Sequence, residues 1–294
     1  MAASGILLVD KPGGMTSHDV VARARRALGT RKIGHAGTLD PMATGLLLLG
    51  VEGATRLLTF IVGLDKTYEA TVRLGVATDT DDADGETIST TDASALTSDA
   101  IDAAIGSLTG RISQVPSTFS AIKVEGRRAY DLARAGQEVR LKAREVTVSR
   151  FDVVAERRAG GVVDLDVVVD CSSGTYIRSL ARDVGAALGV GGHLTALRRT
   201  RIGPFDLVDA VGADEIADRP LRSPADVAAA VLGRVDVTTE EARDLRHGKR
   251  LTGAASRLPA DPAAAIDPDG SLVGVVGARG TDIKSVMNMP EEAR

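Results

Sequence analysis

The sequence predicts an α+β fold built on a mixed or antiparallel sheet. Strand patterns and helix patterns interleave irregularly along the chain, without the strict alternation typical of a doubly wound parallel sheet. Two pairs of strand patterns are joined by short glycine-containing turns, one at Gly160-Gly161 and one at Pro268-Asp269-Gly270. Such turns favour β-hairpins, and hairpins bring antiparallel strands together.

The first fifty residues contain two apolar strand patterns separated by a helix and a loop. Residues 5–10 form an apolar run that Lys11-Pro12-Gly13-Gly14 ends, and Ser17 is positioned as the N-cap of an amphipathic helix that stops at Gly29. Residues 34–45 show no periodicity and precede a second apolar run at residues 46–51. A long irregular loop between regular elements is where functional residues concentrate.

The middle of the chain is rich in strand patterns, which occur at residues 67–74, 146–154, 162–169 and 193–202. Helix patterns occupy residues 98–108 and a segment that starts at Ile177 and stops at Gly189.

Composition changes near residue 219, where an alanine-rich stretch begins. We therefore expect a larger first domain over residues 1–218, a small β-rich C-terminal domain over residues 219–285, and a flexible tail over residues 286–294.

Composition narrows the functional classes. The 294 residues are 44% hydrophobic and 26% charged, as in soluble globular proteins, and they include one cysteine, which excludes an intrachain disulfide. The four histidines and the cysteine show no metal-ligand spacing. No apolar run is long enough for a membrane span and no basic stretch precedes the first apolar run, so a cytoplasmic protein is expected.

Acidic and basic residues are clustered in two separate segments of the chain. Residues 79–86 are rich in aspartate, but an EF-hand loop with Gly85 at its sixth position would place Thr80 and Thr91 at its first and last ligand positions, which excludes that motif. The net charge is −4. Even so, five cations fall within residues 23–32 without an acid among them, which is compatible with a solvated helix face or with a nucleic-acid surface.

Asp40 is the first candidate for chemistry. It precedes Pro41 in a loop bounded by glycines, which restricts the local backbone and allows unusual conformations nearby. A carboxylate held in this way can serve as a nucleophile or a base, although an aspartate in a loop more commonly supports a turn or a helix cap. The residue pattern alone leaves both roles open.

Residues 34–45 closely resemble the GH-x-G-x-LDP-x-A-x-G signature of the TruB-type tRNA pseudouridine synthases. Further motifs follow the family's order and approximate spacing: GILLVDKPGG at 5–14, DKTY at 65–68, DTDDADG at 79–85, QVPSTFSAIK at 114–123, SSGTYIR at 172–178 and LRR at 197–199. The resemblance covers residues 5 to about 205 and is fainter in the C-terminal stretch.

The resemblance implies a pseudouridine synthase catalytic domain with a PUA-like C-terminal domain. It also implies isomerisation of uridine fifty-five in the T-loop of tRNA, by base flipping and without a cofactor or metal. Asp40 matches the nucleophile, Arg178 the guanidinium that keeps it ionised, and Tyr68 the ring that stacks on uracil and assists proton removal. The remaining substrate-binding positions match His35, Tyr176 and Leu197.

The expected partner is the T-arm stem-loop of tRNA, bound by a monomer without an obligate protein partner. The cations expected to contact the RNA backbone are Arg23, Arg26, Arg31, Lys32, Arg127, Arg198 and Arg199. One alternative is a tRNA chaperone whose main role is non-catalytic. Another is a glycoside or nucleoside hydrolase, which would want a second carboxylate, and none stands out in the Asp40 loop.

Overall fold

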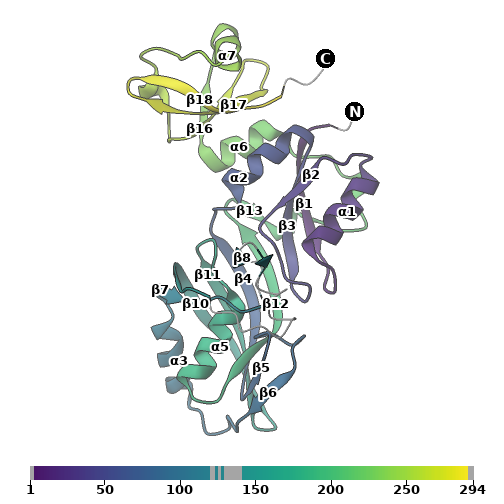
Figure 1. Cartoon of the computed structure of the whole chain (residues 1–294), viewed down its shortest axis with the longest axis vertical. Helices are drawn as coiled ribbons and strands as arrows, with labels where there is room; N and C mark the ends of the chain where they lie inside the picture. Colours follow the sequence, from purple (N-terminus) through teal and green to yellow (C-terminus); the bar gives the residue numbers. More distant parts are fainter. Residues whose placement is uncertain (1–2, 120–122, 125–126, 129–140, 291–294) are drawn as a thin grey trace. The chain divides into compact units, whose positions relative to one another are not determined.

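The computed structural model describes residues 3–119, 123–124, 127–128 and 141–290, with the two short segments described by their backbone alone. The chain forms two compact units, whose elements are labelled in Figure 1. Unit 1 comprises Met1–Pro41, Gly45–Gly63 and Gly203–Arg294, and unit 2 comprises Met42–Thr44 and Leu64–Ile202. Both units combine helices with strands, and their strand pairs are parallel in places and antiparallel in others, which confirms the predicted α+β class with a mixed sheet.

The N-terminal part of unit 1 is a small sheet covered by one helix. Strand β1 (Gly5–Lys11) pairs antiparallel with β3 (Thr44–Val51) and parallel with β14 (Val211–Gly212), and β2 (Ile33–Ala36) pairs with β3. Helix α1 (Ser17–Ala27) buries Val20, Val21 and Ala24 against this sheet. Apolar residues at this spacing lie on one helix face, so the pattern in the sequence explains the packing.

Two local expectations in this region are wrong. The N-cap of α1 is Thr16, whose side chain accepts a hydrogen bond from the backbone of Asp19 in a reciprocal capping box, while Ser17 is the first helical residue. The segment expected to be irregular from residue 34 begins instead in β2, where His35 pairs with Leu49. Pairing with a neighbouring strand does not require a period within four residues, so the sequence carried little signal for it.

The 3-10 helices η1 (Glu52–Leu57), η2 (Leu207–Asp209), η3 (Ile216–Asp218) and η4 (Ala255–Arg257), helix α2 (Leu58–Ile61) and strand β13 (Phe205–Asp206) complete the connections of unit 1.

The C-terminal part of unit 1 is a four-stranded sheet with two helices. Its strand order is β15 (Arg234–Asp236), β16 (Ala263–Ile266), β17 (Leu272–Arg279) and β18 (Asp282–Asn288), and its helices are α6 (Pro224–Leu232) and α7 (Thr239–Arg246). Asn288 still pairs with Gly274, so regular structure continues three residues beyond the expected start of the tail. Leu57 of η1 shares a buried cluster with α6 and β17, which joins this sheet to the N-terminal segment.

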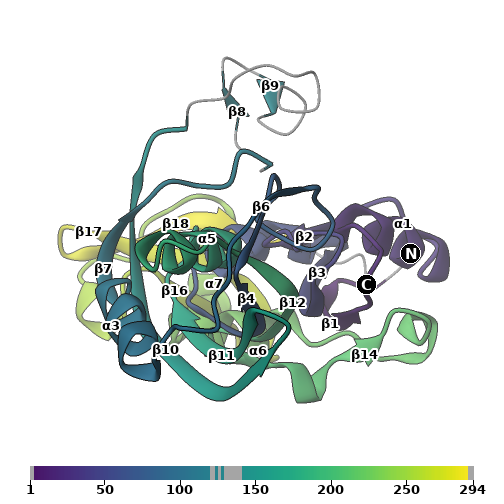
Figure 2. The same ribbon diagram turned by 90° about the horizontal axis from the view of Figure 1, so that it is seen from below.

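Unit 2 is built on a five-stranded antiparallel sheet. The strand order is β12 (Gly192–Ile202), β4 (Lys66–Leu74), β11 (Val162–Cys171), β10 (Arg144–Ala159) and β7 (Gly110–Gln114). Helix α5 (Ile177–Ala187) packs on β12 and β4, and α3 (Ser98–Ser107) lies beside it (Figures 1 and 2). Two further strand pairs form separate two-stranded sheets, β5 (Val76–Thr78) with β6 (Thr87–Thr90) and β8 (Lys123–Val124) with β9 (Arg127–Arg128).

Among the residues that the structure describes, no helix combines the length and the hydropathy needed to cross a bilayer.

Candidate functional site

The loop that carries Asp40 is fixed by the side chain of Ser17. The Ser17 hydroxyl accepts a hydrogen bond from the backbone N–H of Leu39 at 2.8 Å and donates one to the carbonyl of Leu39 at 3.2 Å. Ser17 is 2% exposed and Leu39 is also buried, so water does not compete for these groups. Asp40 itself is half-buried. The residue preceding the candidate nucleophile is therefore held by a buried side chain from α1.

Lys11 holds the other side of the same loop. Its ammonium donates to the carbonyls of Pro12 at 2.9 Å, Met15 at 2.6 Å and Pro41 at 3.3 Å, and the side chain is fully buried. The carbonyl of Pro41 also accepts the N–H of Gly14 at 2.9 Å. A loop outside regular structure must satisfy its backbone groups in other ways, and here a buried cation does so. Asp40 thus lies between two anchored residues.

Tyr68 lies on a face of the unit 2 sheet that it shares with two other predicted residues. Tyr68 on β4 pairs directly with Arg199 on β12, and Ala70 pairs with Leu197. Side chains directly opposite in antiparallel strands project to the same face, and alternate residues along a strand do so too. The structure therefore groups Tyr68, Leu197 and Arg199, all of them buried.

Lys66 begins the same strand and is also buried. Burial, together with the positive charge of Arg199, lowers the pKa of Lys66 to about 8. Its ammonium donates to the carbonyl of Leu64. Two buried cations therefore lie near the start of β4, close along the chain to Tyr68.

Arg178 is buried at 3% exposure and is held by the segment around Asp82. One terminal nitrogen of its guanidinium lies 3.3 Å from a carboxylate oxygen of Asp82 and donates to the carbonyl of Thr80 at 2.8 Å. The other terminal nitrogen donates to the carbonyl of Phe119 at 2.9 Å. Asp82 is itself held by the hydroxyl of Thr80 at 2.6 Å. The aspartate-rich segment thus supplies the partner of an arginine.

The backbone next to Arg178 is clamped by Gln114. The side-chain amide of Gln114 donates to the carbonyl of Tyr176 at 3.0 Å and accepts its N–H at 2.8 Å. Gln114 is buried and Tyr176 is half-buried. This pair of hydrogen bonds fixes the residue that precedes α5 and with it the start of the helix that carries Arg178.

A second arginine, one helical turn further, continues the network. Arg182 lies 3.3 Å from Asp81 and donates to Asp183 at 2.9 Å and to the carbonyl of Val115 at 2.8 Å. Burial raises the pKa of both Asp81 and Asp183, and the positive charge of Arg182 opposes this shift. Asp81 also adopts a left-handed backbone conformation, with φ of 62°. Asp81 and Asp82 of the aspartate-rich segment therefore both pair with arginines of α5, Asp81 with Arg182 and Asp82 with Arg178.

The predicted RNA-backbone cations have different environments. Arg23 pairs with Asp214, and Arg198 donates to the hydroxyl of Thr44 at 3.2 Å. Arg199 follows Arg198 on β12, and its side chain points to the opposite face of the sheet because successive residues of a strand alternate between faces. Arg199 is only 1% exposed there and does not present its guanidinium to solvent. Arg26, Arg31 and Lys32 are exposed around the end of α1. The side chain of Arg127 lies outside the described residues.

The two units hold different parts of the predicted site. Asp40 and His35 belong to unit 1, whereas Tyr68, Tyr176, Arg178 and Leu197 belong to unit 2. His35 is half-buried on β2. The pairing of Asp40 with Arg178 stays a prediction.

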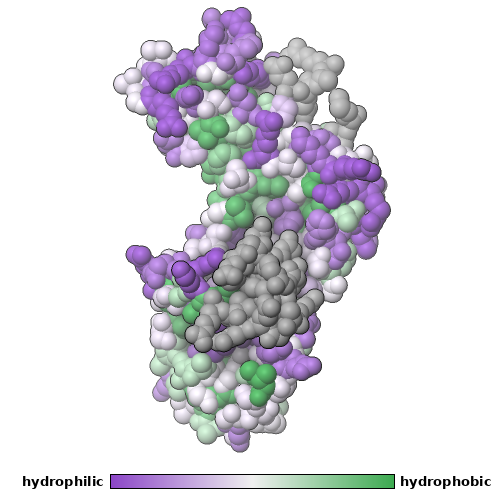
Figure 3. Space-filling view, in the orientation of Figure 1, coloured by the Kyte–Doolittle hydropathy of each residue, from purple (hydrophilic) through white to green (hydrophobic). Residues whose placement is uncertain are grey.

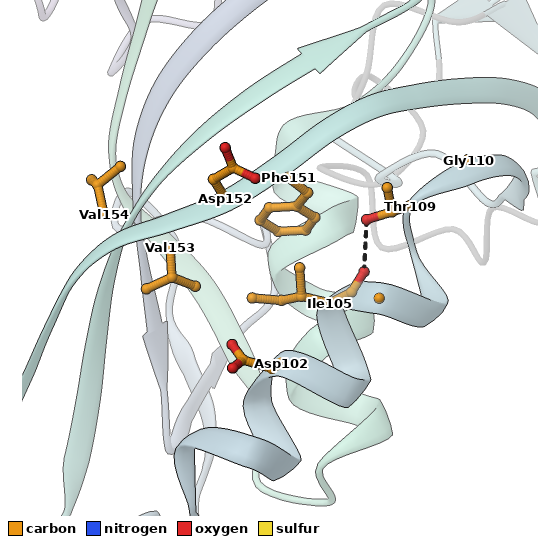
Figure 4. A pocket seen from close by; sticks show the side chains of 9 residues that line it. Asp102, Ile105, Thr109, Gly110, Phe151, Asp152, Val153 and Val154 are labelled. Atoms are coloured by element: carbon orange, nitrogen blue, oxygen red, sulfur yellow. Dashed lines mark hydrogen bonds between the residues drawn. The ribbon is translucent and has the colours of Figure 1, made fainter.

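A separate hollow in unit 2 lies between α3 and β10 (Figure 4). It has a volume of about 820 Å³, and its lining includes Ile105, Phe151 and Val153 as well as the carboxylates of Asp102 and Asp152. The hydroxyl of Thr109 at its edge donates to the carbonyl of Ile105 at 3.0 Å. None of the predicted site residues is among those that line it.

Four positioning residues were not identified from the sequence as parts of a site: Lys11, Ser17, Asp82 and Gln114. Ser17 was expected to cap a helix, and Asp82 was considered only as a calcium ligand. Lys11, Asp82 and Gln114 all lie within motifs quoted for the family resemblance. Membership of these motifs was the signal that could have identified the three residues, but a motif does not indicate what each side chain contacts.

Comparisons with known proteins agree with these motifs. Residues 25–177 match the TruB family pseudouridylate synthase N-terminal domain, residues 178–235 the tRNA pseudouridylate synthase B C-terminal domain, and residues 232–290 the tRNA pseudouridine synthase II C-terminal domain.

Two curated relatives are similar over nearly the whole chain. The tRNA pseudouridine synthase B of Leifsonia xyli is 54% identical, with 99% of this chain and 98% of the relative covered. The protein of the same name from an Arthrobacter species is also 54% identical, with 97% and 96% covered. Among solved structures, a Cbf5-Nop10-Gar1 complex contains a chain of similar fold, with a TM-score of 0.69, 26% identity, and coverage of 98% of this chain and 84% of that one.

Proposed function

The chain belongs to the TruB family of pseudouridylate synthases, and we propose that it isomerises uridine fifty-five in the T-loop of tRNA to pseudouridine. The observation that carries the proposal is the anchoring of the Asp40 loop on both sides, by Ser17 at Leu39 and by Lys11 at Pro41. A nucleophile must be held in one geometry to react efficiently, and a carboxylate that only supported a turn would not need two buried anchors.

In the proposed mechanism, Asp40 is the nucleophile and Arg178 is its ionic partner. A guanidinium remains charged at any working pH and favours the ionised form of a nearby carboxylate. Asp82, Thr80 and Phe119 hold the Arg178 guanidinium within unit 2. This anchoring supports a role in which Arg178 orients a charge and takes no part in proton transfer.

Tyr68 and Leu197 form the floor on which we propose that the uracil ring lies. An aromatic ring stacks on a base, and an apolar side chain beside it excludes water. The target base is paired or stacked inside folded RNA, so the enzyme must extrude it, and His35 is proposed to occupy the vacated space. Tyr176 is proposed to contact the flipped nucleotide.

The reaction breaks one glycosidic bond and forms another within the same nucleotide, so it has no net redox change and we expect no cofactor. The proposed partner is the T-arm of tRNA, bound by a monomer in the cytoplasm. Exposed cations around α1 and Arg198 would contact its phosphates.

The test uses an unmodified tRNA transcript and site-resolved detection of pseudouridine. The wild type should modify one T-loop uridine, and a transcript with cytidine at that position should remain unmodified. The Asp40→Asn variant should bind tRNA with unchanged affinity and form no product, because an amide lacks the nucleophilic charge. Normal turnover by this variant would overturn the proposed role of Asp40.

The Asp40→Asn variant also tests the alternative that the protein acts mainly as a non-catalytic tRNA chaperone. If a strain lacking the gene regains its growth when it expresses Asp40→Asn, then the non-catalytic role dominates. If growth returns only with the wild type, isomerisation is the function that matters.

A further inference from the structure

The turn that follows α1 encloses a basic hollow in unit 1. The hollow has a volume of about 540 Å³ and is lined by Arg25, Arg26, Gly29, Thr30 and Arg31. Arg26 and Arg31 are exposed, and within the described part of the chain neither has an ion-pair partner. Figure 3 shows strongly hydrophilic residues gathered over α1. Two arginines that are not neutralised thus flank one concave surface.

The backbone of this turn is held in a single conformation. Gly29 has a φ of 64°, which only glycine adopts readily, and the N–H of Thr30 donates to the carbonyl of Arg25 at 3.2 Å. The N–H of Lys32 donates to the hydroxyl of Thr30 at 3.2 Å, and the guanidinium of Arg25 donates to the carbonyl of Ile33 at 3.1 Å. Arg25 therefore fixes the turn and leaves Arg26 and Arg31 to face a ligand.

Glu52, the first residue of η1, strengthens this arrangement. Its N–H donates to the carbonyl of Lys32 at 2.8 Å, and its carboxylate accepts the hydroxyl of Thr30. Glu52 makes these contacts with a φ of 52°, a left-handed conformation that is unfavourable for a residue with a side chain. A conformation of this kind persists where the surroundings enforce it, and here the hydrogen bonds of Glu52 with Lys32 and Thr30 hold both Glu52 and the basic turn in place.

We propose that this hollow is a preorganised site for one phosphate group of the RNA backbone, with Arg26 and Arg31 as its ligands. The inference rests on the proposed function, because that function supplies the RNA. Guanidinium groups bind phosphate through paired hydrogen bonds, and a turn that is already rigid loses little entropy when it binds. The positive charges also offset the partial negative charge at the end of α1.

The test compares the double variant Arg26→Gln/Arg31→Gln with the wild type in tRNA binding at salt concentrations from about 50 to 200 mM. Loss of this one phosphate contact should weaken binding roughly tenfold at low salt. It should also reduce the slope of log affinity against log salt by about one.

The matched control is Arg219→Gln/Arg279→Gln. This variant makes the same change in net charge at two exposed arginines that have no ion-pair partner among the described residues. It should keep the wild-type salt slope. If the control loses affinity as much as the test variant, or if the test variant keeps the wild-type slope, the hollow is not a phosphate site.

Two further outcomes are distinguishable. If the wild type fails to modify the transcript, the proposed function fails, whereas the salt slopes still report on the hollow. Titration with inorganic phosphate separates RNA from a free anion. Saturable binding of phosphate to the wild type, without any difference between the RNA slopes, would overturn the inference.

Discussion

The hydroxyl of Ser17 should affect the rate of reaction through the position of Asp40, although it does not touch the substrate in the proposed mechanism. Ser17→Ala removes both hydrogen bonds to Leu39, at 2.8 and 3.2 Å, and leaves a buried N–H and a buried carbonyl without this partner. Each buried group that loses its partner costs about 1–3 kcal/mol. We therefore expect the free energy of unfolding to fall by about 2–6 kcal/mol.

The same loss should displace Asp40, which is bonded directly to Leu39. A displacement of about 1 Å at a reacting group lowers the rate roughly 100-fold. The maximal rate constant of Ser17→Ala should therefore fall by about that factor, with little change in tRNA affinity. Single-turnover formation of pseudouridine at saturating enzyme measures this rate constant, and urea unfolding measures stability.

Thr16→Ala is the matched control because it affects the same helix without touching Leu39. The substitution removes the capping box that the Thr16 hydroxyl forms with Asp19 and should lower the free energy of unfolding by about 1 kcal/mol. It should leave the rate constant near the wild-type value. If Ser17→Ala is destabilised but reacts as fast as Thr16→Ala, then Ser17 supports only the fold and the positioning argument is refuted. Faster hydrogen exchange at the Leu39 amide should accompany the slower rate.

Two further predictions concern buried charges in unit 2. The pKa of Lys66 is about 8, below its ordinary value of 10.5, so the unfolded chain binds more protons between these values and folding stability should rise with pH across this window. The pKa of Cys171 rises from 9.0 to about 11 on burial, which lowers stability above pH 9. The urea concentration at the midpoint of unfolding should therefore increase between about pH 8 and pH 9 in the wild type but stay constant in Lys66→Met. Parallel plots of midpoint against pH for the two proteins would contradict the assignment of this pKa to Lys66. Asp82→Asn should lower activity at least tenfold, because it removes the charge that holds Arg178. Asp84→Asn, at an exposed position in the same segment, should leave activity near the wild-type value. Equal effects of the two substitutions would show that Arg178 does not depend on its ion pair with Asp82.

The sequence predicted the fold best where apolar periodicity is strong. The strand patterns at residues 67–74 and 162–169 became β4 and β11, and the helix pattern from Ile177 became α5. These elements bury one face or both, so their patterns record the packing directly. Strand β2 was missed because four residues paired at an edge leave no such record.

The predicted site was less complete because contacts between distant residues have no local pattern. Ser17 is typical of an N-cap by its type and position, yet its partner lies 22 residues away. Asp82 lies in an acidic stretch typical of a metal loop, yet its partner is an arginine almost a hundred residues further along the chain. Residue type limits what a side chain can do, but the fold decides which of those roles it performs.

The Asp40 loop illustrates why the proposed nucleophile needs such distant support. Strands and helices satisfy most of their own backbone groups, but a loop outside regular structure leaves N–H and carbonyl groups that no ladder pairs. Ser17 and Lys11 satisfy these groups from elements that form for other reasons, a helix and a strand. Because Lys11 serves three carbonyls at once, exchanging it for an apolar residue of similar length would fill the space and still leave the loop unpaired. The volume of the side chain at position 11 therefore does not by itself determine which residues are tolerated there. The number of hydrogen-bond donors that the side chain offers to the loop carbonyls also matters.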